Sequence, residues 1–166
     1  MKKEKTKEIN GYKINLLGKL QQIIIDVNIP GLKIEFTEDE FNKIMEGYHS
    51  KSMEDKWNVI PDGNWVHICR SWTGDEVYRV EILKEKCECG KNKIRSFFVD
   101  RSLVDEHFIE YADYSIFVLL VIFFWGILKK DIRHLIIEKY GKDDKGITQL
   151  WSDFGSMLFN DSTELE

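Results

Sequence analysis

The chain has 166 residues and carries 24 lysines and arginines against 29 aspartates and glutamates, which gives a formal net charge of −5. This length fits one domain. The acidic balance argues against a nucleic-acid partner, because such proteins present a basic surface to phosphates. The basic first residues lead into polar sequence without an apolar signal segment, and the three cysteines are an odd number. We therefore expect a cytoplasmic protein in a reducing compartment.

The first predicted element is an amphipathic helix. Apolar residues recur at steps of three and four from Ile14 to Val27, which is the spacing of one helix face. Pro30 would end this helix. Residues 1–31 are thus predicted to form an N-terminal helical extension.

A short strand over residues 32–36 and a capped helix over residues 38–46 are expected next. Thr37, followed three residues later by Glu40, matches the capping-box pattern. Four strands follow at short spacing and are separated by turn residues, which favours antiparallel hairpins. We place these strands at 57–60, 64–71, 76–84 and 94–99, with turns at 61–63 and 73–75.

Helical sequence dominates the last third of the chain. Residues 116–128 are thirteen consecutive apolar residues, fewer than the about 20 that a membrane span needs. We therefore predict a buried central helix and no membrane association. Helix breaks are expected near 112–113 and 126–130, with an end at Gly141. A last helix is expected to begin at Thr148.

Together these elements predict an α+β fold in a single domain, residues 1–166. An antiparallel β-meander of four to five strands would pack against several helices, with one helix buried at the centre. The helix and meander would occupy residues 32–104, and a helical part would occupy residues 105–159.

Arg70 is the most informative polar residue. Strand alternation places it on the same face as Val66 and Ile68, toward the core or its rim. A guanidinium cannot be buried without an anionic companion. That companion is either a phosphate or carboxylate of a ligand or one of three protein carboxylates, Glu54, Asp55 and Asp100. Trp57 and Trp72 are candidates for stacking on it, unless the clustered tryptophans Trp57, Trp65 and Trp72 only fill the core.

His67 and Cys69 project from the opposite face of the same strand. Together with Cys87 and Cys89 they are a candidate structural zinc site, although a C-x-C spacing differs from the usual zinc knuckle. We otherwise expect no cofactor. A Cys69–His67 nucleophile pair has poor geometry, because neighbours two apart on a strand point outward in parallel. The sequence contains no complete catalytic constellation, so we favour a binding protein over an enzyme.

Several motifs resemble a little-characterised bacterial and phage domain family whose core reads MEDKW…RSWTG…YxV. The matching stretches are Met53-Glu-Asp-Lys-Trp57, Arg70-Ser-Trp-Thr-Gly74 and Val77-Tyr-Arg-Val80, with further similarity at Asp100-Arg101 and Trp151-Ser-Asp-Phe-Gly155. The resemblance covers about residues 50–158. Family members are often found beside ADP-ribose-handling modules, such as ADP-ribosylglycohydrolase-like or macro-like domains. The resemblance therefore implies a role with NAD-derived nucleotides, and it supplies no catalytic residue.

We therefore predict a binding module for a nucleotide-like anionic ligand of the NAD or ADP-ribose class. It would sense or sequester a signalling nucleotide in a phage or bacterial defence setting. Arg70 would hold a phosphate while Trp57 or Trp72 stacks on the base. The further ligand-binding candidates are Lys56 and Arg101 as positive contacts, and Ser71, Thr73 and Gly74 as hydroxyl and backbone donors.

Two other functions fit the same sequence. One is an acidic, non-catalytic immunity or inhibitor protein that binds a protein partner. The other is a hydrolase or transferase that acts on ADP-ribose, with a catalytic acid from residues 54–55 or 100–113. The sequence does not predict the oligomeric state.

Overall fold

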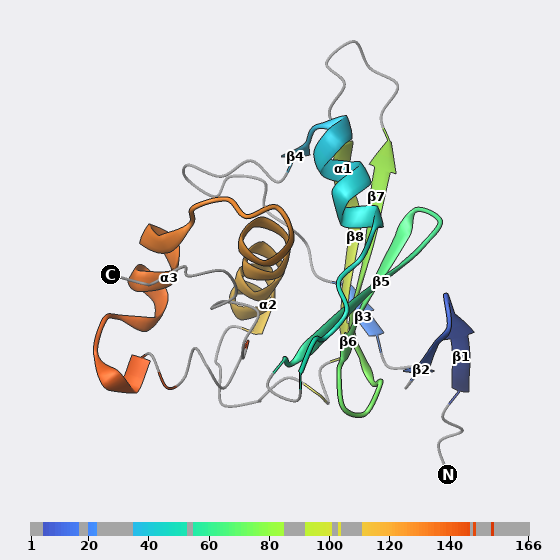
Figure 1. Cartoon of the computed structure of the whole chain (residues 1–166), viewed down its shortest axis with the longest axis horizontal. Coiled ribbons are helices and arrows are strands. Elements are labelled where there is room, and N and C mark those ends of the chain that lie inside the picture. The colour runs from blue at the N-terminus through green and yellow to red at the C-terminus, as the bar shows by residue number, and fades with distance from the viewer. Residues whose placement is uncertain are drawn as a thin grey trace.

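The computed structural model describes residues 5–16, 20–22, 35–52, 55–84, 92–100, 103, 111–146, 148 and 154. These residues form an α+β fold, as predicted. Helices cover one face of an antiparallel sheet, and a two-stranded hairpin lies on the other side (Figure 1).

The described residues contribute six strands to the main sheet. They are β3 (Leu20–Gln22), β4 (Glu35–Phe36), β5 (Trp57–Asp62), β6 (Trp65–Arg70), β7 (Glu76–Lys84) and β8 (Asn92–Asp100). The order is β3-β8-β7-β6-β5, β4 also pairs with β8, and all pairings are antiparallel. Strands β5 to β8 are neighbours in sequence and in space, so the predicted meander is confirmed. Two short strands, β3 and β4, extend it at β8.

The predicted N-terminal helix is wrong for the residues that the structure describes. Strands β1 (Lys5–Ile9) and β2 (Tyr12–Leu16) form a separate antiparallel hairpin, and β3 follows. Asn10 and Gly11 form the turn with φ of 51° and 83°. An Asn-Gly pair suits a tight hairpin turn, because both positions require positive φ. This local signal outweighs the helical spacing of the apolar residues.

Helix α1 (Glu38–Met45) has the predicted capping box. The Glu40 amide donates to the Thr37 hydroxyl at 3.2 Å, and the Thr37 amide donates to the Glu40 carboxylate at 3.0 Å. At the far side of Glu40, Lys130 Nζ lies 2.5 Å from Oε2. This ion pair ties α1 to the segment that follows the central helix.

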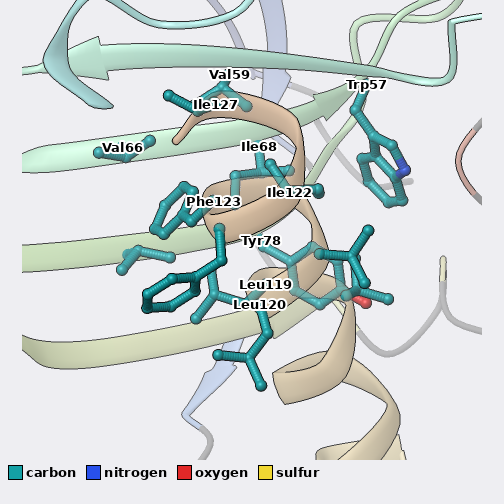
Figure 2. Close-up of a cluster of buried hydrophobic side chains, with 14 of the residues drawn as sticks. Trp57, Val59, Val66, Ile68, Tyr78, Leu119, Leu120, Ile122, Phe123 and Ile127 are labelled. Carbon is teal, nitrogen blue, oxygen red and sulfur yellow. The ribbon is translucent and has the colours of Figure 1, made fainter. Parts of the chain in front are cut away.

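The core lies between the meander and the apolar segment of the chain (Figure 2). Helix α2 (Tyr111–Leu120) continues into the π-helix η2 (Val121–Ile127), and every residue of η2 is buried. The predicted buried central helix is therefore confirmed, although its π-helical form was not predicted. Within the described residues, no helix has the length and apolar character that crossing a bilayer requires.

The central helix ends where the sequence predicted a break. The Leu128 amide donates to Phe123 O at 2.9 Å, and Lys129 has φ of 56°. Helix α3 (Arg133–Tyr140) follows and ends at Gly141, as predicted.

Smaller predictions have mixed outcomes. Pro61 and Asp62 belong to β5, so the turn lies at residues 63–64 and not at 61–63. The break expected near 112–113 is wrong, because α2 runs through these residues without interruption. The expected helix start after residue 102 lies largely outside the described residues, and so does most of the last helix, in which only Thr148 and Phe154 are described.

We expect Gly47→Ala to destabilise the protein more than Gly63→Ala. Both glycines have positive φ, +77° and +63°, at which an L-residue costs about 1–2 kcal/mol. A Cβ added at Gly47 would also lie 2.6 Å from Val59 O, whereas nothing lies within 4 Å of one at Gly63. Urea unfolding measures the free energy of unfolding of each variant. Equal losses in the two variants would contradict the close approach of Gly47 to β5.

Candidate functional site

Arg70 ends β6 on the sheet face that packs against the helices. Its cross-strand partner is Trp57, the first residue of β5. Val66 and Ile68 belong to the main core, as strand alternation predicts for this face. Arg70 is half-buried, and its Cζ lies 4.2 Å from the centroid of the Trp57 ring. The guanidinium therefore stacks on an aromatic ring at the rim of the core.

Trp57 is held firmly beneath this guanidinium. Its exposed fraction is 1%, and its ring packs against Tyr78 with the two centroids 5.8 Å apart. A ring buried in this way has no face for a flat ligand. Trp57 can orient Arg70, and of the two tryptophans predicted to stack on a base, Trp72 is the one that can reach a ligand.

Arg70 has no ion pair with a carboxylate of the described residues. Among the predicted companions, Asp55 is buried and accepts hydrogen bonds from the Tyr48 hydroxyl at 3.1 Å and the Lys51 amide at 2.7 Å. Asp100 lies on β8, and Glu54 lies outside the described residues. A guanidinium presents five N–H donors in a fixed planar arrangement that suits a carboxylate or a phosphate.

Residues 71–74 connect β6 to β7, and we call them the Trp72 loop. The Arg70 amide donates to Asp75 O at 2.9 Å, and the Gly74 amide donates to Arg70 O at 2.9 Å. Gly74 has φ of +75°, a conformation that favours glycine. Trp72 is 66% exposed and is the single exposed large hydrophobic side chain in the described part of the chain.

Internal hydrogen bonds use some of the donors that were predicted to face a ligand. The Ser71 hydroxyl donates to Asp55 O at 2.5 Å, and the Ser71 amide donates to Lys56 O at 3.0 Å. The Gly74 amide is bonded to Arg70 O. These donors stabilise the loop and are not available to a ligand.

The remaining predicted positions differ in what they can contribute. The Thr73 hydroxyl accepts from the Asp75 amide at 3.2 Å and can still donate its own hydrogen. Lys56 is half-buried and lies beside the loop through its backbone bond to Ser71. Arg101 lies outside the described residues.

A buried ionic network lies on the opposite face of β6 and β7. Glu76 is 2% exposed and hydrogen-bonds His67 Nδ1. The Arg79 guanidinium donates two hydrogen bonds to the same carboxylate, from Nη2 to Oε1 at 2.6 Å and from Nε to Oε2 at 3.1 Å. This bidentate contact is a strong form of charge-assisted hydrogen bond.

The network shifts the pKa of Glu76. Burial raises the pKa of Glu76, but hydrogen bonds from His67 and Arg79 and the charge of Arg79 outweigh it, so the pKa is lowered. An ionised carboxylate only accepts, so His67 Nδ1 carries the hydrogen of their bond. The other ring nitrogen, Nε2, lies 3.9 Å from Asp62 Oδ2.

Cys69 has the properties of a structural cysteine. It is 1% exposed and packs in a small apolar cluster with Ile9, Ile14 and Ile60. Burial, with the negative charge of Glu76, raises the pKa of its thiol, which opposes a nucleophilic thiolate.

The predicted zinc site cannot be assembled from the described residues. No group of three or more suitable ligands occurs among them. His67 directs Nδ1 at Glu76, and Cys87 and Cys89 lie outside the described residues. The zinc site stays a prediction.

Sequence reasoning missed Glu76, Arg79 and Asn15. Strand alternation alone places Arg79 on the face of His67, opposite the apolar face of β7. Asn15 was assigned to a helix, and it instead contacts the Trp72 loop.

Comparisons with known proteins assign no family to this chain. No family model, curated protein or solved structure matches it. The resemblance to the bacterial and phage domain family therefore stays a prediction from the motifs alone.

We expect Glu76→Gln to destabilise the protein by about 3 kcal/mol at pH 7, because it leaves Arg79 and His67 without their charged companion. Since the folded-state pKa of Glu76 is lowered, its contribution is present above the unfolded pKa of about 4.3. That contribution is lost as the pH falls through the lower folded-state pKa. Urea unfolding should show a larger difference from wild type at pH 7 than at pH 3.

Glu81→Gln is the matched control on the same strand. Glu81 is half-buried and pairs with the exposed Arg95 at 3.6 Å, and ion pairs that are open to solvent on one side contribute little more than the about 0–1 kcal/mol of surface pairs. A loss in Glu76→Gln as small as in Glu81→Gln would show that the buried network does not stabilise the fold.

Proposed function

We propose that this protein binds a nucleotide-like anionic ligand of the NAD or ADP-ribose class through Arg70 and Trp72. The observation that carries the proposal is Arg70 itself. Its guanidinium is half-buried, held over Trp57 at 4.2 Å, and has no carboxylate partner among the described residues. An oriented arginine with no carboxylate partner in the described part of the chain suits a phosphate, which it can bind in bidentate fashion.

Trp72 supplies the second half of such a site. It lies two residues from Arg70, and two residues of chain span at most about 7 Å. Their backbones are therefore close enough for one ligand that joins a phosphate to a flat ring to reach both side chains. The exposed indole of Trp72 can stack on the base of the ligand, and the hydroxyl of Thr73 can donate a hydrogen bond to the same ligand.

The proposed biological setting rests on the motif resemblance. A cytoplasmic binding module without a reaction of its own would sense or sequester a signalling nucleotide during phage infection. Net charge does not oppose this role, because the local cations Arg70 and Lys56 lie next to the Trp72 loop.

Calorimetry against ADP-ribose, NAD and cyclic ADP-ribose tests the proposal. We expect heat with at least one of them. Arg70→Ala should weaken binding by at least tenfold, because hydrogen bonds to a charged group contribute about 1.5–3 kcal/mol. Trp72→Ala should weaken it by a similar factor, since stacking contributes about 1–3 kcal/mol per base.

Arg95→Ala is the control for loss of one positive charge. Arg95 lies on β8 with 63% of its side chain exposed, and it contacts Glu81. Its removal should leave the affinity unchanged. Absence of heat with all three compounds, or equal affinities in Arg70→Ala and wild type, would refute the proposed function.

The exposure of Trp72 also favours a second candidate, an inhibitor or immunity protein with a protein partner. Tryptophan and arginine are enriched at the energetic centres of protein interfaces. This candidate gains support if none of the nucleotides binds and a purified partner loses affinity for Trp72→Ala but not for Arg95→Ala.

No observation favours the hydrolase or transferase. The described carboxylates with a shifted pKa are Glu40, Glu76 and Asp131. Each has its own cationic partner, respectively Lys130, Arg79 and Arg133, and none contacts Arg70.

A further inference from the structure

Asn15 of β2 connects the N-terminal hairpin to the Trp72 loop. Its amide nitrogen donates to Gly74 O at 2.9 Å. Its side-chain Nδ2 donates to Thr73 O at 2.8 Å and to Asp75 Oδ1 at 3.1 Å. One residue therefore contacts three consecutive residues of the connection between β6 and β7.

The side chain of Asn15 is fully engaged. Its Oδ1 accepts from the Thr6 hydroxyl at 3.4 Å, so both ends of the amide have partners and its orientation is set. The backbone of β2 is equally close to the loop. A Cβ added at Gly74 would lie 2.6 Å from Lys13 O. The hairpin and the loop thus approach each other with no room for an intervening side chain.

The loop is held at its other end as well. Ser71 bonds Asp55 O and Lys56 O, which lie before β5. Trp72 stands between these two attachments and is exposed. A loop anchored at both ends holds the backbone that carries this exposed indole in one place. A ligand that stacks on this indole therefore binds to a loop that is already ordered. If binding had to order the loop, the affinity would be lower.

The attachment of the hairpin does not depend on Asn15. Asn10 Nδ2 donates to Pro61 O at 2.7 Å, and Lys7 Nζ lies 3.4 Å from Asp62 Oδ2. The apolar cluster of Ile9, Ile14, Ile60 and Cys69 holds the same hairpin to the sheet. Loss of the Asn15 side-chain bonds can therefore free the loop while the hairpin stays in place.

We propose that Asn15 is a positioning residue, which orders the Trp72 loop and so determines the affinity of the ligand site. The claim about affinity rests on the proposed function. The claim about loop order does not, because it concerns only the contacts between β2 and the loop.

Asn15→Asp tests the proposal with a minimal change of shape. It replaces Nδ2 by a carboxylate oxygen that faces Thr73 O and the Asp75 carboxylate, so attraction becomes repulsion. Asn10→Asp is the matched control. It makes the same chemical change in the same hairpin, at a turn position with φ of 51° that aspartate also tolerates, and it removes an anchor that does not touch the loop.

Amide hydrogen exchange and calorimetry with ADP-ribose are measured on both variants. We expect faster exchange at the Gly74 amide and about tenfold weaker binding in Asn15→Asp, as if one molecule in ten held the competent loop. Asn10→Asp should change neither. Equal exchange at Gly74 in the two variants, or equal affinities despite faster exchange, would overturn the positioning role.

The two proposals fail in different ways. If wild type binds none of the nucleotides, the proposed function fails, and exchange at Gly74 alone decides whether Asn15 orders the loop. If wild type binds and Asn15→Asp binds equally well, the proposed function stands and the positioning role fails.

Discussion

The fold depends on the packing of one wholly apolar helical segment against one face of the meander. Phe36 of β4 contacts Phe124 with ring centroids 5.6 Å apart and Phe123 with centroids 5.9 Å apart. Every residue of η2 is apolar or glycine, so no side of this helix favours contact with water, and all of its residues are buried. The sheet must then present apolar side chains to it along its whole inner face. Trp57 belongs to this core, and the guanidinium of Arg70 stacks on its ring.

The other face of the sheet is stabilised differently. The N-terminal hairpin covers it with a small apolar cluster, and beside this cluster the carboxylate of Glu76 is neutralised by Arg79 and bonded to His67. Strands β6 and β7 are therefore held on both faces. The loop between them begins and ends on fixed strands, and a binding loop on such a scaffold needs little reordering when it meets a ligand. The candidate site thus combines a rigid support with an exposed aromatic tip.

The sequence by itself determined the elements whose signals are local. Alternation with short turns specified the meander, the pattern of Thr37 and Glu40 specified the start of α1, and a run of apolar residues specified a buried helix. The same reasoning placed Arg70 on the inner face, because a strand has a period of two and leaves no other choice once Val66 and Ile68 are buried. Strand alternation could not tell which of Trp57 and Trp72 is exposed, because both are tryptophans with polar neighbours in the sequence.

Only the tertiary structure decided the contacts between segments distant in the chain. The spacing of apolar residues after Ile14 suits a helix, and the Asn10-Gly11 pair is a local signal for a hairpin. The burial of Ile14 in one cluster with Ile60 of β5 requires the hairpin to lie on the sheet, which no local signal indicates. The bonds of Asn15 to the Trp72 loop and the ionic network of Glu76 depend on the register between strands. A one-residue change of register would turn every side chain to the opposite face. Local sequence cannot encode such pairings, because they exist only when the whole sheet has formed.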